Sequence, residues 1–76
     1  MTLNKHQLDG VGGFSQRTMA VEKFEAKLKS AGYSFLGSGQ AKGGRHKIWW
    51  THSSYRRIEA IYSDDKTTVI TAYHPG

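Results

Sequence analysis

The residues best suited to chemistry lie in the second half of the chain, where histidines and charged side chains alternate with apolar ones. The four that stand out by type are His46, Arg57, Glu59 and His74. Carboxylates and imidazoles transfer protons, and a guanidinium stabilises the negative charge that develops on a phosphoryl group under attack. Together they predict a catalytic site that cleaves phosphodiester bonds in RNA. Glu59 or one histidine is the expected base, the other histidine the acid, and Arg57 the charge stabiliser.

The excess positive charge is concentrated in residues 42–57. The chain has 11 Lys and Arg against 6 Asp and Glu, a net charge of +5, and this window holds five of the bases and none of the acids. Such a window attracts phosphate polymers or acidic protein surfaces, and the alternative is a solvated face without a ligand. The five basic side chains are predicted to contact the phosphates of a nucleic acid, and one of two tryptophans to stack on its nucleobases. These residues are Lys42, Arg45, Lys47, Arg56, Arg57, Trp49 and Trp50.

Composition excludes several other classes of site. The chain has no cysteine, and the spacing of its four histidines fits no zinc signature, so neither a metal nor another cofactor is expected. No apolar run approaches the roughly 18 residues of a membrane helix, and the N-terminal residues lack an apolar signal core. We expect a cytoplasmic protein with no membrane contact, although a released toxin fragment or an excised domain has the same composition.

One helix is predicted over residues 18–31. Its apolar residues recur at helical spacing on one face, Ser15 or Thr18 can cap its start, and Gly32 stands at the C′ position where helices end. The apolar face consists of Val21, Phe24, Leu28 and Ala31.

The pattern changes to strands after Gly32. Residues 33–36, 45–51, 55–63 and 67–74 are rich in β-formers, and the glycine-rich segment 37–44 reads as a flexible loop. Residues 1–17 read as a flexible arm. The prediction is therefore a single α+β domain over 18–76, with one N-terminal helix packed on a three- to four-stranded antiparallel meander sheet.

Two assumed turns give the strands a register. A two-residue turn at Asp65-Lys66 places Ile61 opposite Ile70, Glu59 opposite Ala72 and Arg57 opposite His74. A four-residue loop over 51–54 places Trp50 opposite Tyr55 and His46 opposite Glu59. These pairings collect the four candidate catalytic residues on one face, and a one-residue slip would divide them.

The two adjacent tryptophans must point to opposite sides of their strand. One of Trp49 and Trp50 is expected in the core. The other is expected to be exposed, covered by the arm or used at an interface.

The stretch from Phe24 to Trp50 resembles the HicA-type messenger-RNA interferase toxins. The resemblance lies in the helix, Ala31-Gly32-Tyr33, a strand, and Gly43-Gly44-Arg45-His46 entering the next strand, and the tail Val69 to Gly76 is similar to their later strand. It implies a double-stranded-RNA-binding-like fold with His46 as the catalytic residue. Arg45 stands where those toxins usually have serine, and their C-terminal helix has no counterpart in this sequence.

Residues 18–74 also resemble the barnase/RelE-like ribonuclease toxins, as a helix followed by a four-stranded meander that ends in Thr71-Ala72-Tyr73. This resemblance implies that His, Glu, Arg and Lys side chains on the sheet cut RNA.

Three functions stay open on the sequence. The first is a metal-independent endoribonuclease of toxin type, with RNA as substrate and an acidic antitoxin or host protein as partner. The second is a non-catalytic RNA- or DNA-binding module. The third is a small inhibitor or adaptor, of a kind that phages encode, docking on an acidic protein. Each is compatible with a monomer or a homodimer.

Overall fold

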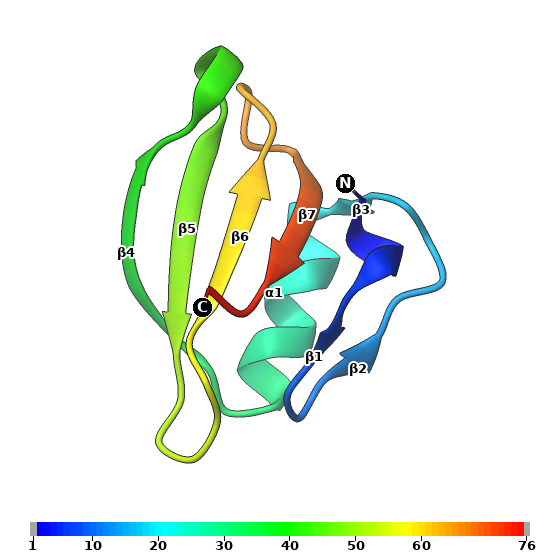
Figure 1. Ribbon diagram of the computed structural model, residues 1–76, viewed down its shortest axis with the longest axis vertical. Coiled ribbons are helices and arrows are strands. Elements are labelled where there is room, and N and C mark those ends of the chain that lie inside the picture. The colour runs from blue at the N-terminus through cyan, green and yellow to red at the C-terminus, as the bar shows by residue number, and fades with distance from the viewer. Residues whose placement is uncertain (1, 76) are drawn as a thin grey trace.

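A five-stranded antiparallel sheet with one helix behind it forms the body of the computed structural model, which describes residues 2–75 (Figure 1). The strand order is β3-β7-β6-β5-β4, and a separate hairpin pairs β1 with β2. The bounds are β1 Gln7–Leu8, β2 Gly12–Gly13, β3 Met19–Ala20, α1 Val21–Ser30, β4 Ser34–Gln40, β5 His46–Thr51, β6 Ile58–Tyr62 and β7 Thr68–Tyr73, with 3-10 turns η1 Leu3–Lys5 and η2 Lys42–Gly44.

The α+β class and the meander β4 to β7 are confirmed, but the predicted number of strands is too small. The added strand is β3, whose two residues pair with the outer edge of β7 through Met19 and Val69. This pairing also explains why α1 begins at Val21 and not at residue 18, because the chain is still extended at Ala20.

Helix α1 buries the predicted apolar stripe. Phe24 and Leu28 are fully buried, and Val21 and Ala31 pack partly against the core. The predicted caps Ser15 and Thr18 are wrong, since the N-cap is Ala20 and makes no side-chain cap bond. The C-terminal prediction is confirmed, because Gly32 follows the helix with a φ of 96°, a conformation that favours glycine.

Strand β4 is longer than predicted and includes glycines that the sequence pattern assigned to a loop. It continues through Gly37 and Gly39 to Gln40, with a bulge between Phe35 and Gly37. The reason lies across the strand pair, where the Trp49 ring packs against both glycines and occupies the space that a side chain at Gly39 would fill. Packing thus overrides the loop preference of these residues.

The predicted register between β5 and β6 is wrong by three residues. Trp50 lies opposite Ile58, not Tyr55, so the connection spans residues 51–57. His52 holds this longer loop: its Nδ1 accepts the backbone N–H of Ser54 at 2.9 Å, and its Nε2 bonds the carbonyl of Ala31 at 2.8 Å. Because the error is odd, it moves His46 and Glu59 to opposite faces of the sheet.

The predicted register between β6 and β7 is wrong by one residue. Glu59 lies opposite Tyr73 and Ile61 opposite Thr71, in place of Ala72 and Ile70. The turn is wider than two residues, since the Ser63 N–H bonds the Thr68 carbonyl at 2.8 Å, and a bulge follows it.

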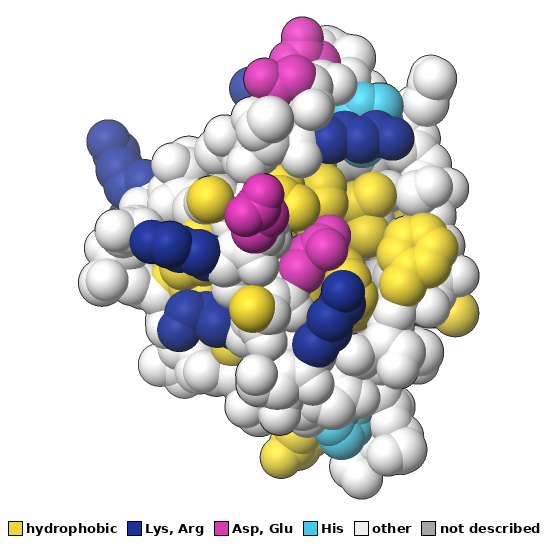
Figure 2. All heavy atoms as spheres, turned by 180° about the vertical axis from the view of Figure 1, so that it is seen from behind, with side chains coloured by type: hydrophobic (Ala, Val, Ile, Leu, Met, Phe, Trp, Pro, Cys, Tyr) yellow, Lys and Arg dark blue, Asp and Glu magenta, His cyan; other side chains and the backbone are white. Residues whose placement is uncertain are grey.

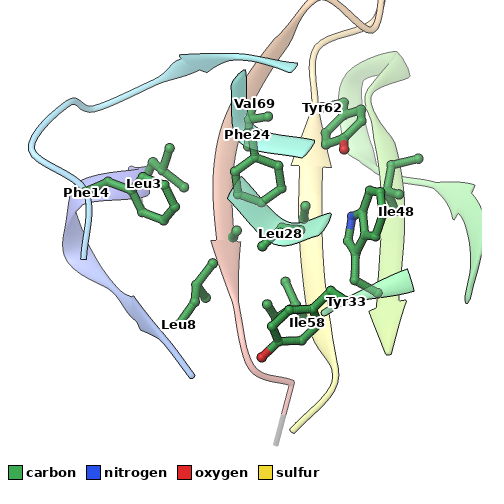
Figure 3. Packing of buried hydrophobic residues seen from close by; sticks show 13 residues of the cluster. Leu3, Leu8, Phe14, Phe24, Leu28, Tyr33, Ile48, Ile58, Tyr62 and Val69 are labelled. Atoms are coloured by element: carbon green, nitrogen blue, oxygen red, sulfur yellow. The ribbon is translucent and has the colours of Figure 1, made fainter. Parts of the chain in front are cut away.

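The core lies between α1 and the sheet face that it covers (Figure 3). The segment predicted as a flexible arm, residues 1–17, contributes to it within the described residues. Leu3, Leu8 and Phe14 are buried, and the Phe14 ring lies 5.9 Å from that of Phe24. The remaining members come from α1, the strands and the connection between α1 and β4: Phe24, Leu28, Tyr33, Ile48, Trp50, Ile58, Ala60, Tyr62, Val69 and Ala72.

No helix within residues 2–75 is both long enough and apolar enough to cross a membrane.

Candidate active site on the open sheet face

The face of the sheet turned away from α1 carries one row of residues across four strands, and Figure 1 shows this face toward the viewer. Gly37 of β4 lies opposite Trp49 of β5, Trp49 opposite Glu59 of β6, and Glu59 opposite Tyr73 of β7. Alternation along each strand turns these residues away from the core, because their neighbours Trp50, Ala60 and Ala72 are buried. We call the row Trp49, Glu59 and Tyr73 the open-face row.

Glu59 is the centre of the open-face row. The Trp49 indole N–H donates to Oε1 at 2.9 Å, and the Tyr73 hydroxyl donates to Oε2. Partial burial alone would raise the pKa of the carboxyl, but these two hydrogen bonds and the charges of Lys47 and Arg57 outweigh it and lower the pKa below its usual value. Glu59 is therefore ionised at neutral pH, and each oxygen keeps a free lone pair, since a carboxylate oxygen accepts two bonds.

The same hydrogen bond changes the pKa of Tyr73. The hydrogen bond that its hydroxyl donates to Glu59 raises the pKa of Tyr73 to about 12, because ionised tyrosine would lose the bond and face a carboxylate. A group with a raised pKa favours folding while protonated, so its contribution is present below the ordinary value of 10.0 and is lost between pH 10 and about 12.

This linkage gives a first prediction. Tyr73→Phe should make the free energy of unfolding fall less steeply between pH 10 and 12 than in the wild type, as measured by urea unfolding at each pH. Tyr62 has a raised pKa from burial and its bond to Glu25, and it titrates alike in both proteins. Equal slopes in the two proteins would contradict the Tyr73–Glu59 bond.

Two cations border the carboxylate without neutralising it. Lys47 stands diagonally across β5 and β6 from Glu59, and Arg57 precedes Glu59 by two residues. Both act on Glu59 electrostatically, yet among residues 2–75 neither forms an ion pair with it. They can therefore receive an anion placed over the open-face row.

Trp49 is held flat against the neighbouring strand. A Cβ added at Gly39 would lie 2.9 Å from Cη2 of the indole, and one added at Gly37 would lie 3.7 Å from Cε3. Gly39 thus makes room for the ring, whereas a side chain at Gly37 would meet it in ordinary van der Waals contact. The ring stays half-buried on the open face. Together with Tyr73 it presents aromatic surface beside cations, the combination on which unpaired bases stack.

A cleft of about 440 Å³ continues the site beyond Tyr73. It is lined by His6, Gln7, Arg56, Tyr73 and His74, so the N-terminal segment forms one of its walls. The His6 ring lies 5.8 Å from the Tyr73 ring, and its Nε2 is buried with no hydrogen-bond partner among the described residues. The His6 ring therefore lies beside that of the tyrosine whose hydroxyl donates to Glu59.

The predicted catalytic residues are only partly together. Glu59, Arg57 and His74 lie at one end of β6 and β7, where Nδ1 of His74 bonds the carbonyl of Arg57 at 2.9 Å. His46 lies opposite Tyr62 toward the other end, and its Nε2 bonds the carbonyl of Asp64 at 3.1 Å. The cluster predicted from the assumed register therefore does not form.

The basic window is likewise divided. Lys42 and Arg45 are exposed at the η2 turn, whereas Arg56 and Arg57 are exposed in the loop at the far end of β5, and Lys47 lies between them. Arg56 is paired, with Nε 2.9 Å and Nη2 3.1 Å from the carboxylate of Asp9. This pair holds the pKa of Asp9 at about 2. Trp50, predicted as a possible stacking residue, is buried in the core.

The charged side chains on the α1 side of the molecule do not gather by sign. Figure 2 shows acidic and basic side chains interspersed on that face. Three charged residues of α1, Glu22, Lys23 and Lys27, are exposed. A phosphate polymer would meet both signs of charge on that face.

Sequence reasoning missed two residues of the site. Tyr73 was placed on the wrong face by the one-residue register error, and His6 was set aside with the arm. Alternation along the strand gave no signal for Tyr73, because the bulge puts the buried Val69 on the other face from Thr71 and Tyr73, and His6 had no signal either. Within residues 2–75, no three His, Asp or Glu side chains gather as a metal site.

Comparisons with protein-family models, with curated proteins and with solved structures find no match to this chain. The HicA-type and barnase/RelE-like resemblances therefore stay predictions from the residues alone.

Proposed function

We propose that this protein is a small metal-independent endoribonuclease of toxin type that acts at the open-face row. The observation that carries the proposal is an ionised carboxylate, Glu59, flanked by two cations that do not pair with it, Lys47 and Arg57. A base beside charge-stabilising cations is what RNA cleavage by its own 2′-hydroxyl requires.

Glu59 takes the proton of the 2′-hydroxyl as that oxygen bonds to phosphorus. Lys47 and Arg57 stabilise the extra negative charge on the phosphoryl oxygens. The bond from phosphorus to the 5′ oxygen then breaks, and the products carry a 2′,3′-cyclic phosphate and a 5′-hydroxyl. This chemistry uses groups of the chain alone, and a cytoplasmic location and an acidic inhibitor protein are part of the proposal.

A second candidate function is RNA binding without cleavage, and the aromatic surface of the open-face row favours it. Trp49 and Tyr73 lie on either side of Glu59 across the strands. Stacking on such rings contributes about 1–3 kcal/mol per base without reading its sequence. The hydrogen bonds that lower the pKa of Glu59 also make it a weaker base.

The experiment uses a 5′-labelled single-stranded oligoribonucleotide with EDTA present. The wild-type protein should cut it and leave a 2′,3′-cyclic phosphate. A matched oligonucleotide with 2′-deoxyribose at the cut position should stay intact there, because it lacks the nucleophile.

The other outcomes identify the other functions. Binding without cleavage, with log affinity falling linearly against log salt, would replace the ribonuclease by a binding module. No binding even at low salt would reject both and leave an adaptor that docks on an acidic protein.

A further inference from the structure

Strand β4 forms one edge of the five-stranded sheet, and no strand within residues 2–75 pairs with its outer side. It stands last in the strand order and pairs only with β5. Figure 1 shows it as the outermost strand, on the side of the sheet away from the N-terminal segment. The backbone N–H and C=O groups that point outward from such a strand are a template for pairing with another chain. We call this outer side of β4, Ser34–Gln40, the free edge.

The free edge lacks most of the features that protect edge strands. Proteins keep such strands short, charged, bulged or interrupted by proline. The strand at the other edge, β3, has only two residues, whereas β4 has seven and contains neither a charged residue nor a proline. A bulge between Phe35 and Gly37 is its one protective feature, and from Gly37 to Gln40 the pairing with β5 is regular. The free edge is therefore long and regular enough to pair with a further strand.

A row of the core ends in the open at β4. Phe35 lies opposite Trp50, and Trp50 lies opposite Ile58, so the row crosses three strands. Ile58 is 0% and Trp50 2% exposed, but Phe35 is 60% exposed, and Leu36 in the bulge is also exposed. Directly opposed residues share a face and pack together. An apolar side chain opposite Phe35, on a further strand, would therefore complete the row.

The charges around the free edge are all positive. Residues 26–58 contain seven Lys and Arg and no Asp or Glu. Lys42 and Arg45 are exposed in and just after the η2 turn that joins β4 to β5, and neither forms an ion pair with another residue of 2–75. A second copy of the chain would bring two positive hairpins together, whereas an acidic segment would complement them. Charge therefore favours an acidic partner at this edge.

We infer that the free edge binds an acidic, extended peptide segment of another protein by strand addition. The segment pairs its backbone with β4 as a sixth strand of the sheet. It places an apolar side chain opposite Phe35 and carboxylates near Lys42 and Arg45. In this mode of recognition the main-chain hydrogen bonds give affinity and alternate side chains give specificity. The inference concerns the edge of the sheet and does not rest on the ribonuclease activity proposed for the open-face row.

The probe for the free edge is a fluorescein-labelled synthetic peptide of about nine residues in which valine alternates with glutamate. At roughly 3.3 Å per residue, it is long enough to cover β4. Fluorescence anisotropy with the full chain at low salt should show saturable binding that weakens as salt is added. Neither of two control peptides should bind: one has lysine in place of glutamate, and in the other every backbone N–H is methylated.

Protein variants test the apolar contact and the charge separately. Phe35→Ser should weaken binding of the acidic peptide by about 10-fold, because the apolar side chain opposite residue 35 loses its contact. Gln40→Glu should weaken it by about threefold at low salt, because the change adds a negative charge to the free edge.

The matched control is the same substitution elsewhere. Gln16 is exposed between β2 and β3, and β3 is the strand at the other edge of the sheet. Gln16→Glu should therefore leave the affinity close to that of the wild type. Phe35 and Gln40 are also exposed, so all three variants should fold, which circular dichroism checks.

Amide hydrogen exchange locates the bound peptide. The N–H groups of β4 that point away from β5 should exchange quickly in the protein alone and slowly when the peptide is bound. The exchange of α1 should not change. Protection of other elements with no change in β4 would contradict strand addition.

Three further results would overturn the inference. The first is no binding of the acidic peptide at low salt, or equal binding of the methylated peptide. The second is a protein that sedimentation shows to be a dimer with the amides of β4 already protected, because a second copy would then occupy the free edge. The third is protection of these amides by a single-stranded RNA oligonucleotide and not by the peptide, which would assign the edge to RNA.

Discussion

Replacing Trp50 with alanine is expected to lower the free energy of unfolding by about 3–5 kcal/mol. Trp50 is only 2% exposed and packs in the core, with its ring 6.1 Å from that of Phe35 in an edge-to-face arrangement. Truncation would leave a large cavity between α1 and the sheet. Since a domain of this size has only about 5–15 kcal/mol in total, this single change should bring the protein close to unfolding.

The matched control is the neighbouring residue. Trp49→Ala should cost about 1 kcal/mol, because Trp49 is half-buried on the open face and loses chiefly its hydrogen bond to Glu59. Urea unfolding followed by far-ultraviolet circular dichroism measures both variants without relying on tryptophan emission. Equal losses, or a larger loss for Trp49→Ala, would contradict the observed register of β5.

These two tryptophans also show what a sequence can and cannot provide. Alternation along a strand predicted that they point to opposite sides, and the structure confirms it. Which of them joins the core depends on tertiary packing, and the sequence pattern left that open. Trp50 is buried because its face of β5 also carries Ile48 and lies against α1.

The register between β5 and β6 depends on contacts that are distant in sequence. Residues 55–57 have strand-forming types, which is why the sequence predicts a strand from Tyr55. In the structure they stay in the loop, because the Tyr55 ring packs against those of Tyr33 and His52, and Arg56 pairs with Asp9. A partner 47 positions away in the chain leaves no local signal.

The residues of the candidate site differ from the predicted ones because contacts distant in sequence also set their positions. Glu59 and Arg57 are neighbours as predicted, because they are two residues apart in the chain, one in β6 and the other just before it. His46 does not lie beside Glu59 as predicted, because a register error of an odd number of residues exchanges the two faces of a strand. Tyr73 lies opposite Glu59 because of the bulge after the β6–β7 turn, and the N-terminal segment brings the His6 ring beside that of Tyr73.

The second large effect is expected at Glu59. Glu59→Gln should reduce kcat for RNA cleavage by about 10²–10⁴-fold, because the amide cannot take the proton of the 2′-hydroxyl. The amide is close to isosteric and its oxygen can still accept one of the two bonds from Trp49 and Tyr73, so the fold should persist. Glu22→Gln is the control, since Glu22 is an exposed carboxylate on α1, on the other side of the sheet.

The pH dependence follows from the lowered pKa of Glu59. A base must be ionised to act, so activity that depends on Glu59 is lost only as the pH falls through its folded value, which lies below the ordinary 4.5. Cleavage by the wild type should therefore show no acid limb between pH 5 and 7, as measured by kcat/KM over that range. An acid limb near neutrality would indicate that a histidine, not Glu59, is the base.

RNA affinity separates loss of chemistry from loss of binding in the same variant. Removing one negative charge beside Lys47 and Arg57 should leave the affinity of Glu59→Gln for RNA equal to or higher than that of the wild type. A variant that cuts slowly but binds well places Glu59 in the reaction. If Glu59→Gln instead cuts RNA at the wild-type rate, the carboxylate only orients Trp49 and Tyr73, and the open-face row is a surface for stacking bases.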